Sequence, residues 1–145
     1  MVYVVAVFDG QRGNYSEEDA PNPLSTYASS KLEGERRVLV ANPEAAVARV
    51  NLHGWSISGK RSLAEFFFYN LKAGKRVLGF TDVHFCPVLA NDLAGVFSAM
   101  LQKGLKGIFH AVSSDSLTKY DFGLRIARKF GLDENLIEPA SVEQA

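Results

Sequence analysis

The sequence predicts an α/β fold, a layered structure with a mainly parallel sheet. Segments with strand character alternate along the chain with segments of helical periodicity, and this alternation favours parallel strands with helices packed against them. The chain has 145 residues, of which 47% are hydrophobic and 22% charged, values that suit a globular domain with a real core. We therefore predict a single domain over residues 1–145.

The first two elements are a strand and a long helix. Residues 2–8 are apolar without interruption, as in a parallel strand buried on both faces, and the run is too short for a signal peptide or a membrane span. A loop rich in turn formers follows and extends to Pro23. A helix then starts at Ser25, a good N-cap, and ends before Asn42. Its buried stripe contains one polar residue and consists of Ala28, Leu32, Glu35 and Leu39.

The remaining elements continue the alternation. We expect strands at 45–52, 76–80 and 107–112, and helices at 62–73, 91–103 and 118–131. Thr118 and Asp121 have the spacing of a capping box at the start of the last helix, and Gly131 is typical of a helix end. The aromatic run 66–69 is expected to belong to the core.

Composition excludes several classes of function. The 16 basic and 16 acidic residues give a formal net charge of zero, so no basic surface for nucleic acid or anionic membranes is predicted. Cys86 is the single cysteine, which rules out an internal disulfide and suits a reducing cytoplasm. The histidines at 53, 84 and 110 are far apart and lack the spacing of a metal site, so we predict no metal.

Tyr27 and Lys31 carry the clearest chemical signal. Residues four apart on a helix share a face, so the ammonium group of Lys31 is expected beside the phenol of Tyr27. A free tyrosine titrates near pH ~10, and a neighbouring positive charge favours the phenolate and lowers the pKa, as proton transfer near neutrality requires. An incidental pair on a helix surface is the alternative, because both residue types are common.

The surroundings of this pair resemble a known enzyme family. Val7-Phe8-Asp9-Gly10, the run 15–35 around Tyr27, and the later stretches 80–94, 107–110 and 119–120 are similar to the extended short-chain dehydrogenase/reductases. Within them the likeness is to the dTDP-4-dehydrorhamnose reductase group. The resemblance implies a partial Rossmann-type fold that corresponds to the later, catalytic and substrate-binding half. It also implies reduction of a 4-keto nucleotide sugar with NADPH or NADH.

The same resemblance implies roles for individual residues. Tyr27 would donate the proton, and Lys31 would assist it and also bind the nicotinamide ribose, so both count as catalytic and cofactor-binding. Asn51 and Trp55 are the implied contacts to the nucleotide sugar. Lys60 and Arg61 are open to two interpretations, contact with a pyrophosphate or simple solvation in a loop.

Two parts of the family pattern are absent. No glycine-rich turn joins a strand to a helix N-terminus, where a dinucleotide pyrophosphate would bind. No Ser or Thr precedes Ser16, although the family carries a catalytic hydroxyl at the end of its central strand. We therefore expect the chain to be incomplete for catalysis on its own, which leaves open whether it is an enzyme. The alternative is a non-catalytic nucleotide-sugar-binding or regulatory module similar to the regulatory β-subunit of methionine adenosyltransferase.

The loop after the second predicted strand is similar to a phosphate-binding loop. Residues 54–61 nearly match a phosphate-binding P-loop, but Arg61 stands where the mechanism requires a Ser or Thr to bind Mg²⁺, so an ATPase is rejected.

If residues 2–8 were a central strand, one of its edges would be uncovered in this chain. Exposed strand edges recruit other chains, so we expect self-association through the first strand.

Overall fold

The computed structural model describes residues 2–4, 7–57 and 62–142. Contacts between residues divide the chain into two compact units, each built from two stretches of sequence. Unit 1 consists of Met1–Asn51 and Asn91–Val112, and unit 2 of Leu52–Ala90 and Ser113–Ala145. The expectation of one domain over residues 1–145 stays a prediction.

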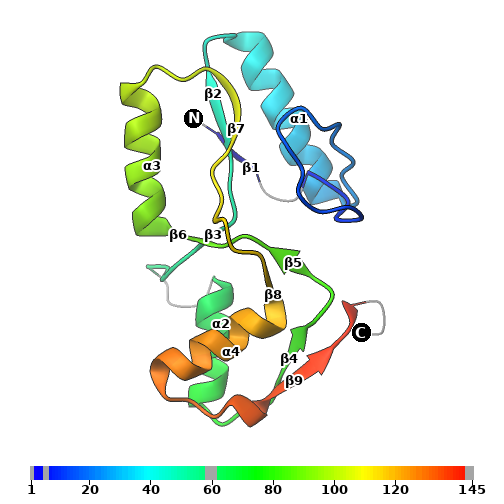
Figure 1. The fold of residues 1–145 in the computed structure, drawn as a ribbon, viewed down its shortest axis with the longest axis vertical. Helices are drawn as coiled ribbons and strands as arrows, with labels where there is room; N and C mark the ends of the chain where they lie inside the picture. The colour runs from blue at the N-terminus through cyan, green and yellow to red at the C-terminus, as the bar shows by residue number, and fades with distance from the viewer. Residues whose placement is uncertain (1, 5–6, 58–61, 143–145) are drawn as a thin grey trace. The chain divides into compact units, whose positions relative to one another are not determined.

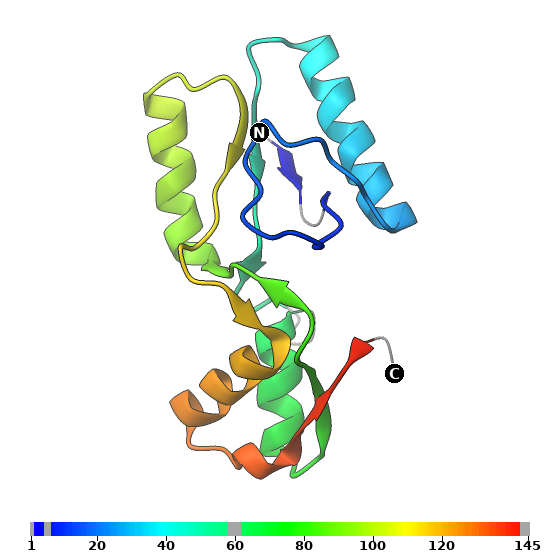
Figure 2. The same cartoon turned by 45° about the vertical axis from the view of Figure 1, so that its right-hand side comes forward.

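Unit 1 is built on a parallel sheet with the strand order β1-β2-β7. The strands are Val2–Val4 (β1), Ala46–Arg49 (β2) and Gly107–His110 (β7). They lie between helices α1 (Thr26–Ala41) and α3 (Ala90–Gln102) in both views (Figure 1, Figure 2). Because the strands are parallel, they end at the same edge of the sheet, the edge at which α/β proteins bind ligands.

Local sequence explains where α1 begins and how it packs. The Ser25 side chain accepts a hydrogen bond from the Ala28 N–H at 3.1 Å, which caps the first turn. Pro43 disfavours helical backbone at the residue before it, so the helix ends at Ala41. Leu32 on the inner stripe of α1 contacts the sheet and completes a core formed with Val7, Val47, Phe8, Val38, Leu39 and Ile108.

Unit 2 packs two helices against pairs of short strands (Figure 1). The helices are α2 (Leu63–Lys72) and α4 (Lys119–Phe130). Two strand pairs are parallel: β4 (Val77–Phe80) with β9 (Ile137–Ala140), and β3 (Leu52–His53) with β6 (Val88–Leu89). The third pair, β5 (His84–Phe85) with β8 (Leu117–Thr118), is antiparallel, and a 3-10 turn (Glu134–Leu136) precedes β9.

A glycine allows the two helices of unit 2 to approach closely. Gly123 lies inside α4, and a Cβ placed there would be 2.6 Å from Cε1 of Phe67 on α2. Phe67 is 1% exposed and belongs to the core of the unit. The other buried members of that core are Ala64, Leu71, Val77, Phe122, Ala127 and Ile137.

The α/β class and the mainly parallel pairing are confirmed. All four expected helices form within two residues of the predicted bounds, and none in the described part of the chain is long and apolar enough to cross a bilayer. The expected strand 45–52 is broken into β2 and β3, and residues 5 and 6 lie outside the described residues. The core prediction for 66–69 is wrong in part, because Phe66 and Tyr69 are each 46% exposed.

Candidate functional site

Tyr27 and Lys31 lie on one face of the first two turns of α1. The Lys31 Nζ is 5.1 Å from the centre of the Tyr27 ring, within the range of a cation–π contact. Tyr27 is 59% exposed and Lys31 is half-buried, so the phenol is accessible to a ligand. A positive charge fixed beside an accessible phenol is the arrangement required of a tyrosine proton donor.

A buried ion pair joins α1 to the middle strand of the sheet. Glu35 is 1% exposed and Arg49, the last residue of β2, is 6% exposed. The guanidinium donates two parallel hydrogen bonds, from Nε to Oε1 of Glu35 at 3.0 Å and from Nη2 to Oε2 at 2.9 Å. Removing one partner of such a pair would leave a buried charge uncompensated, at a cost of about 3–5 kcal/mol.

Arg49 also contacts the end of β7 and a ring from the segment after β1. Its Nη1 lies 3.3 Å from Nε2 of His110, the last residue of β7, and its Cζ lies 5.1 Å from the ring centre of Phe8. The edge of His110 meets the Phe8 ring at a centre-to-centre distance of 5.6 Å. The carboxyl edge of the sheet is therefore organised around one guanidinium group.

The loop before α1 is closed by hydrogen bonds to Asp9. The Tyr15 hydroxyl donates to Asp9 Oδ1 at 2.5 Å, and its ring stacks on Phe8 at 4.4 Å with only 4° between the planes. Asn22 donates to Asp9 Oδ2 and the Gln11 N–H to Oδ1, both at 3.0 Å. These bonds, that of Tyr15 first, lower the pKa of the Asp9 carboxyl to about 2.

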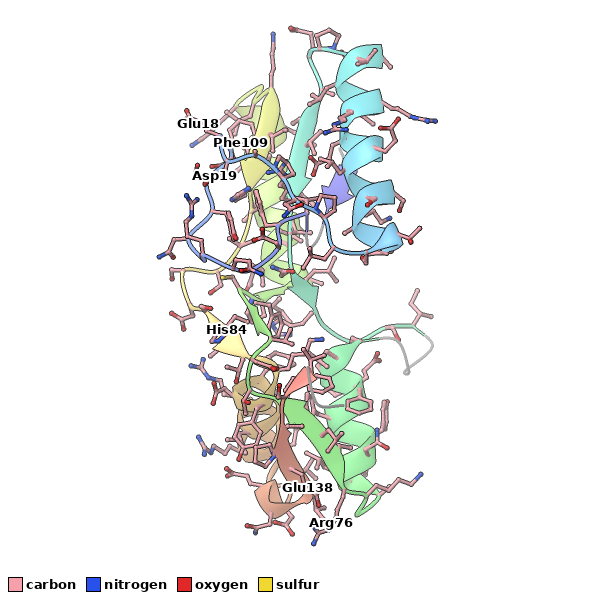
Figure 3. All side chains as sticks on the ribbon, turned by 90° about the vertical axis from the view of Figure 1, so that its right-hand side faces the viewer. Glu18, Asp19, Arg76, His84, Phe109 and Glu138 are labelled. Atoms are coloured by element: carbon pink, nitrogen blue, oxygen red, sulfur yellow. The ribbon has the colours of Figure 1, made fainter. Side chains whose placement is uncertain are left out.

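Two carboxylates hold the second half of this loop. Glu17 accepts a hydrogen bond from the His110 N–H at 2.7 Å, and this bond is the main reason why the pKa of Glu17 is lowered. Asp19 accepts bonds from the N–H of Ser16 and from Arg12, which lower its pKa to about 2. Figure 3 labels Asp19 and its neighbour Glu18 on this loop. Residues 17–21 line a groove of about 290 Å³ with α1 and the sheet.

A second groove, of about 430 Å³, lies in unit 2 between α2 and β4. Its walls are mostly apolar, and Lys119 and Arg76 add positive charge. Arg76 is paired with Glu138 of β9 at 2.5 Å (Figure 3), whereas the Lys119 Nζ lies 5.7 Å from the ring centre of Phe80. The remaining lining residues are Leu63, Phe66, Phe67, Asn70, Val77 and Leu78.

The predicted site residues are distributed over both units. Tyr27, Lys31 and Asn51 belong to unit 1 and Trp55 to unit 2, and none of the four lines either groove. Trp55 is 53% exposed, and its ring meets Phe68, Tyr69 and Phe130 edge to face. Phe68 lies on the side of α2 opposite the groove-lining Leu63 and Asn70, whereas Tyr69 is three residues after Phe66 and lies near its face.

Sequence reasoning missed the roles of two buried carboxylates. Glu35 was recognised as a polar interruption of the α1 stripe, but its partner Arg49 was not. Glu65 is 1% exposed and accepts hydrogen bonds from the N–H groups of Ser56 and Ser62, which fixes both ends of the loop before α2. The capping box formed by Ser62 and Glu65 was a readable signal. Lys60 and Arg61, and with them the end of the P-loop-like run, lie outside the described residues.

The described residues do not fit the pyrophosphate of a nicotinamide dinucleotide. Gly10 and Gly13 have positive φ angles of 77° and 73° and open space around them, but they lead into a loop rather than a helix N-terminus. A dinucleotide cradle needs that N-terminus directly after the turn. The cofactor-binding roles that the resemblance implies for Tyr27 and Lys31 stay predictions. Within the described ranges, no group of three or more His, Cys, Asp or Glu residues could hold a metal ion.

Comparison with known proteins identifies two kinds of relative. The chain is 36% identical over 147 residues to methionine adenosyltransferase 2 subunit beta of Danio rerio, an alignment that covers 96% of this chain and 45% of that protein. It is also 36% identical over 136 residues to Agl14 of Haloferax volcanii, described as a probable low-salt glycan biosynthesis reductase, with 91% and 45% covered. The chain thus spans less than half the length of each relative.

A solved structure of a similar protein has the same fold. A dTDP-4-dehydrorhamnose reductase from Bacillus anthracis, in complex with NADP, superposes with a TM-score of 0.89 at 22% identity, covering 99% of this chain and 51% of that one. This likeness shows a Rossmann-like fold. Residues 2–145 match the family described as the RmlD substrate binding domain, and the chain belongs to this family.

Proposed function

We propose that the chain supplies the proton-donating and sugar-nucleotide-binding half of an NAD(P)-dependent reductase of 4-keto nucleotide sugars. The observation that carries this proposal is the accessible Tyr27 phenol with the Lys31 ammonium group 5.1 Å from its ring. The kinship at 36% identity with Agl14, described as a probable low-salt glycan biosynthesis reductase, supports it. The single free cysteine, Cys86, suits a cytoplasmic location.

The residues act on the carbonyl oxygen of the substrate. As the 4-keto carbon is reduced, negative charge develops on this oxygen, and the Tyr27 hydroxyl donates its proton there. Lys31 stabilises the phenolate that remains, until solvent returns the proton. When bound, the reduced nicotinamide supplies the hydride to the carbonyl carbon. Asn51 and Trp55 are proposed as contacts to the nucleotide sugar.

The groove of unit 2, taken by itself, is proposed as a surface that binds a nucleotide. A base is flat and largely apolar on its faces, which suits the aromatic side chains of Phe66 and Phe80. A phosphate carries negative charge, which suits Lys119 at the same groove. Ligand sites combine apolar walls with a few placed polar groups in this way.

The test is turnover of a dTDP-4-keto sugar with NADPH, with the cofactor-binding part of a related reductase added if the chain alone is inactive. Tyr27→Phe should lower kcat by about 10²–10⁴-fold, the usual worth of general acid catalysis. Tyr69→Phe is the matched control, because Tyr69 is similarly exposed but lies on α2. Turnover that is unchanged in Tyr27→Phe would remove Tyr27 from the mechanism.

A second candidate function is a non-catalytic, nucleotide-sugar-binding or regulatory module. It is favoured by the absence of a Ser or Thr from residues 2–8 and by kinship with the methionine adenosyltransferase subunit. Calorimetry separates the two: binding of a dTDP-sugar without binding of NADPH supports the module, whereas tight binding of NADPH by the chain alone argues against it.

Self-association through the first strand is part of the proposal. β1 pairs with β2 on one side, and no described strand pairs with its other edge. An open edge of a parallel sheet offers unpaired backbone groups to another chain. Sedimentation should therefore show a dimer or larger species at micromolar concentration, and a monomer would contradict this part.

A further inference from the structure

The direction in which the Tyr27 phenol points depends on how α1 is rotated about its own axis. Apolar contacts on the inner stripe of α1, such as that of Leu32, hold the helix against the sheet but tolerate small rotations, because hydrophobic burial has no direction. A bidentate ion pair does have a direction, since both oxygens of the carboxylate must meet both nitrogens of the guanidinium.

Glu35 is placed to use this property. It follows Lys31 by one turn and Tyr27 by two turns of the same helix, so the three side chains keep a fixed angular relation. Glu35 is 1% exposed, and both of its oxygens are bound by Arg49. Any rotation of α1 that redirected Tyr27 would break at least one of these two hydrogen bonds.

Arg49 is itself held from several sides. It is the last residue of β2, its Nη1 meets His110 at the end of β7, and its Cζ lies 5.1 Å from the Phe8 ring. His110 in turn donates its N–H to Glu17 of the loop before α1. These contacts fix the orientation of α1 relative to the ends of β2 and β7 and to the loop that leads into the helix.

We propose that Glu35 and Arg49 are positioning residues that fix the rotation of α1 and thereby aim Tyr27 and Lys31 at the substrate. The inference rests on the proposed role of Tyr27. Buried ion pairs can often be replaced by apolar residues with little loss of stability, so such a pair is better explained by the geometry that it specifies.

The experiment labels the five tyrosines of the full chain with 3-fluorotyrosine and records fluorine NMR spectra. The Tyr27 resonance is assigned by its loss in Tyr27→Phe. In the double variant Glu35→Met/Arg49→Met no charge is left unpaired, and we expect a folded chain in which the Tyr27 resonance shifts or broadens while those of Tyr69 and Tyr120 in unit 2 stay. The matched control is Glu33→Met/Arg37→Met, which removes an exposed ion pair from the same helix and should leave Tyr27 unchanged.

A double variant that folds and keeps the Tyr27 resonance at its wild-type position and width overturns the proposal, whatever its stability. If the double variant does not fold, Arg49→Lys decides, because lysine keeps the charge but cannot form the bidentate pair. It should displace the Tyr27 resonance, and an unchanged resonance again overturns the proposal. The spectra need no substrate, so a failure of turnover would count against the role of Tyr27 and leave this result standing.

Discussion

Gly123→Ala tests the packing of unit 2 at its closest point. The new Cβ would lie 2.6, 2.8 and 2.9 Å from three ring carbons of Phe67, whereas carbon atoms in contact prefer about 3.5–4.0 Å. The ring must therefore retreat by about 1 Å into a core in which it is already 1% exposed.

The expected change is a balance of two opposing effects. Overpacking of a tight core costs about 1–3 kcal/mol, and we expect the upper part of this range because the blocking atoms are a buried ring. Alanine in a helix interior gains about 1 kcal/mol over glycine. Gly123→Ala should therefore lower the free energy of unfolding of unit 2 by about 1–2 kcal/mol.

Trp55, the single tryptophan, lies in unit 2 against Phe68 and Phe130, so its fluorescence during urea unfolding reports on this unit. The cost should shrink in a Phe67→Leu background, since the smaller side chain makes room. Gly95→Ala in α3 is the control for helix propensity. Apart from its own stretch of helix, no described residue has an atom within 4 Å of its Cβ position, so circular dichroism should show a gain of about 0.5–1 kcal/mol in the free energy of unfolding. A Gly123→Ala chain as stable as the wild type would refute the packing argument.

Two further predictions concern the loops. The pKa of Asp9 is lowered in the folded chain, so its contribution to the stability of the folded loop is present above pH ~4 and is lost as the pH falls through about 2. Asp9→Asn should abolish this pH dependence and speed amide exchange of residues 10–24 at neutral pH. Equal exchange in the variant and the wild type would count against this role of Asp9. Glu65→Gln should lower the free energy of unfolding of unit 2 by about 2 kcal/mol in urea, because it replaces a buried carboxylate that accepts several hydrogen bonds. The control Glu33→Gln changes an exposed residue and should stay within about 0.5 kcal/mol of the wild type. Similar losses in both variants would show that the burial of Glu65 does not matter.

The sequence predicted best what depends on neighbouring residues. Ser25 caps α1 as expected, Thr118 accepts the Asp121 N–H at 2.9 Å, and Gly131 ends α4 in the left-handed conformation with φ of 63°. Each of these signals acts within one or two turns of helix. The α/β class was predictable for a related reason, since it follows from the alternation of such local patterns.

What depends on distant partners was not predictable. β5 and β8 have two residues each, and they become strands only because residues 84–85 meet 117–118 across the fold. The same holds for the Glu35–Arg49 pair, whose members are 14 residues apart and belong to different elements. Phe66 and Tyr69 are exposed because the buried residues of α2 lie mainly on its other side, which the run of four aromatic residues at 66–69 does not reveal.

The site for a nucleotide sugar proposed on this chain can be tested by titration calorimetry with a dTDP-sugar. We expect saturable binding that is weakened in Lys119→Met, at the groove of unit 2. Binding should be unchanged in Lys129→Met, because Lys129 is an exposed lysine of the same helix outside the groove lining. Absence of binding heat over a range of temperatures, or equal binding by Lys119→Met and the wild type, would contradict it.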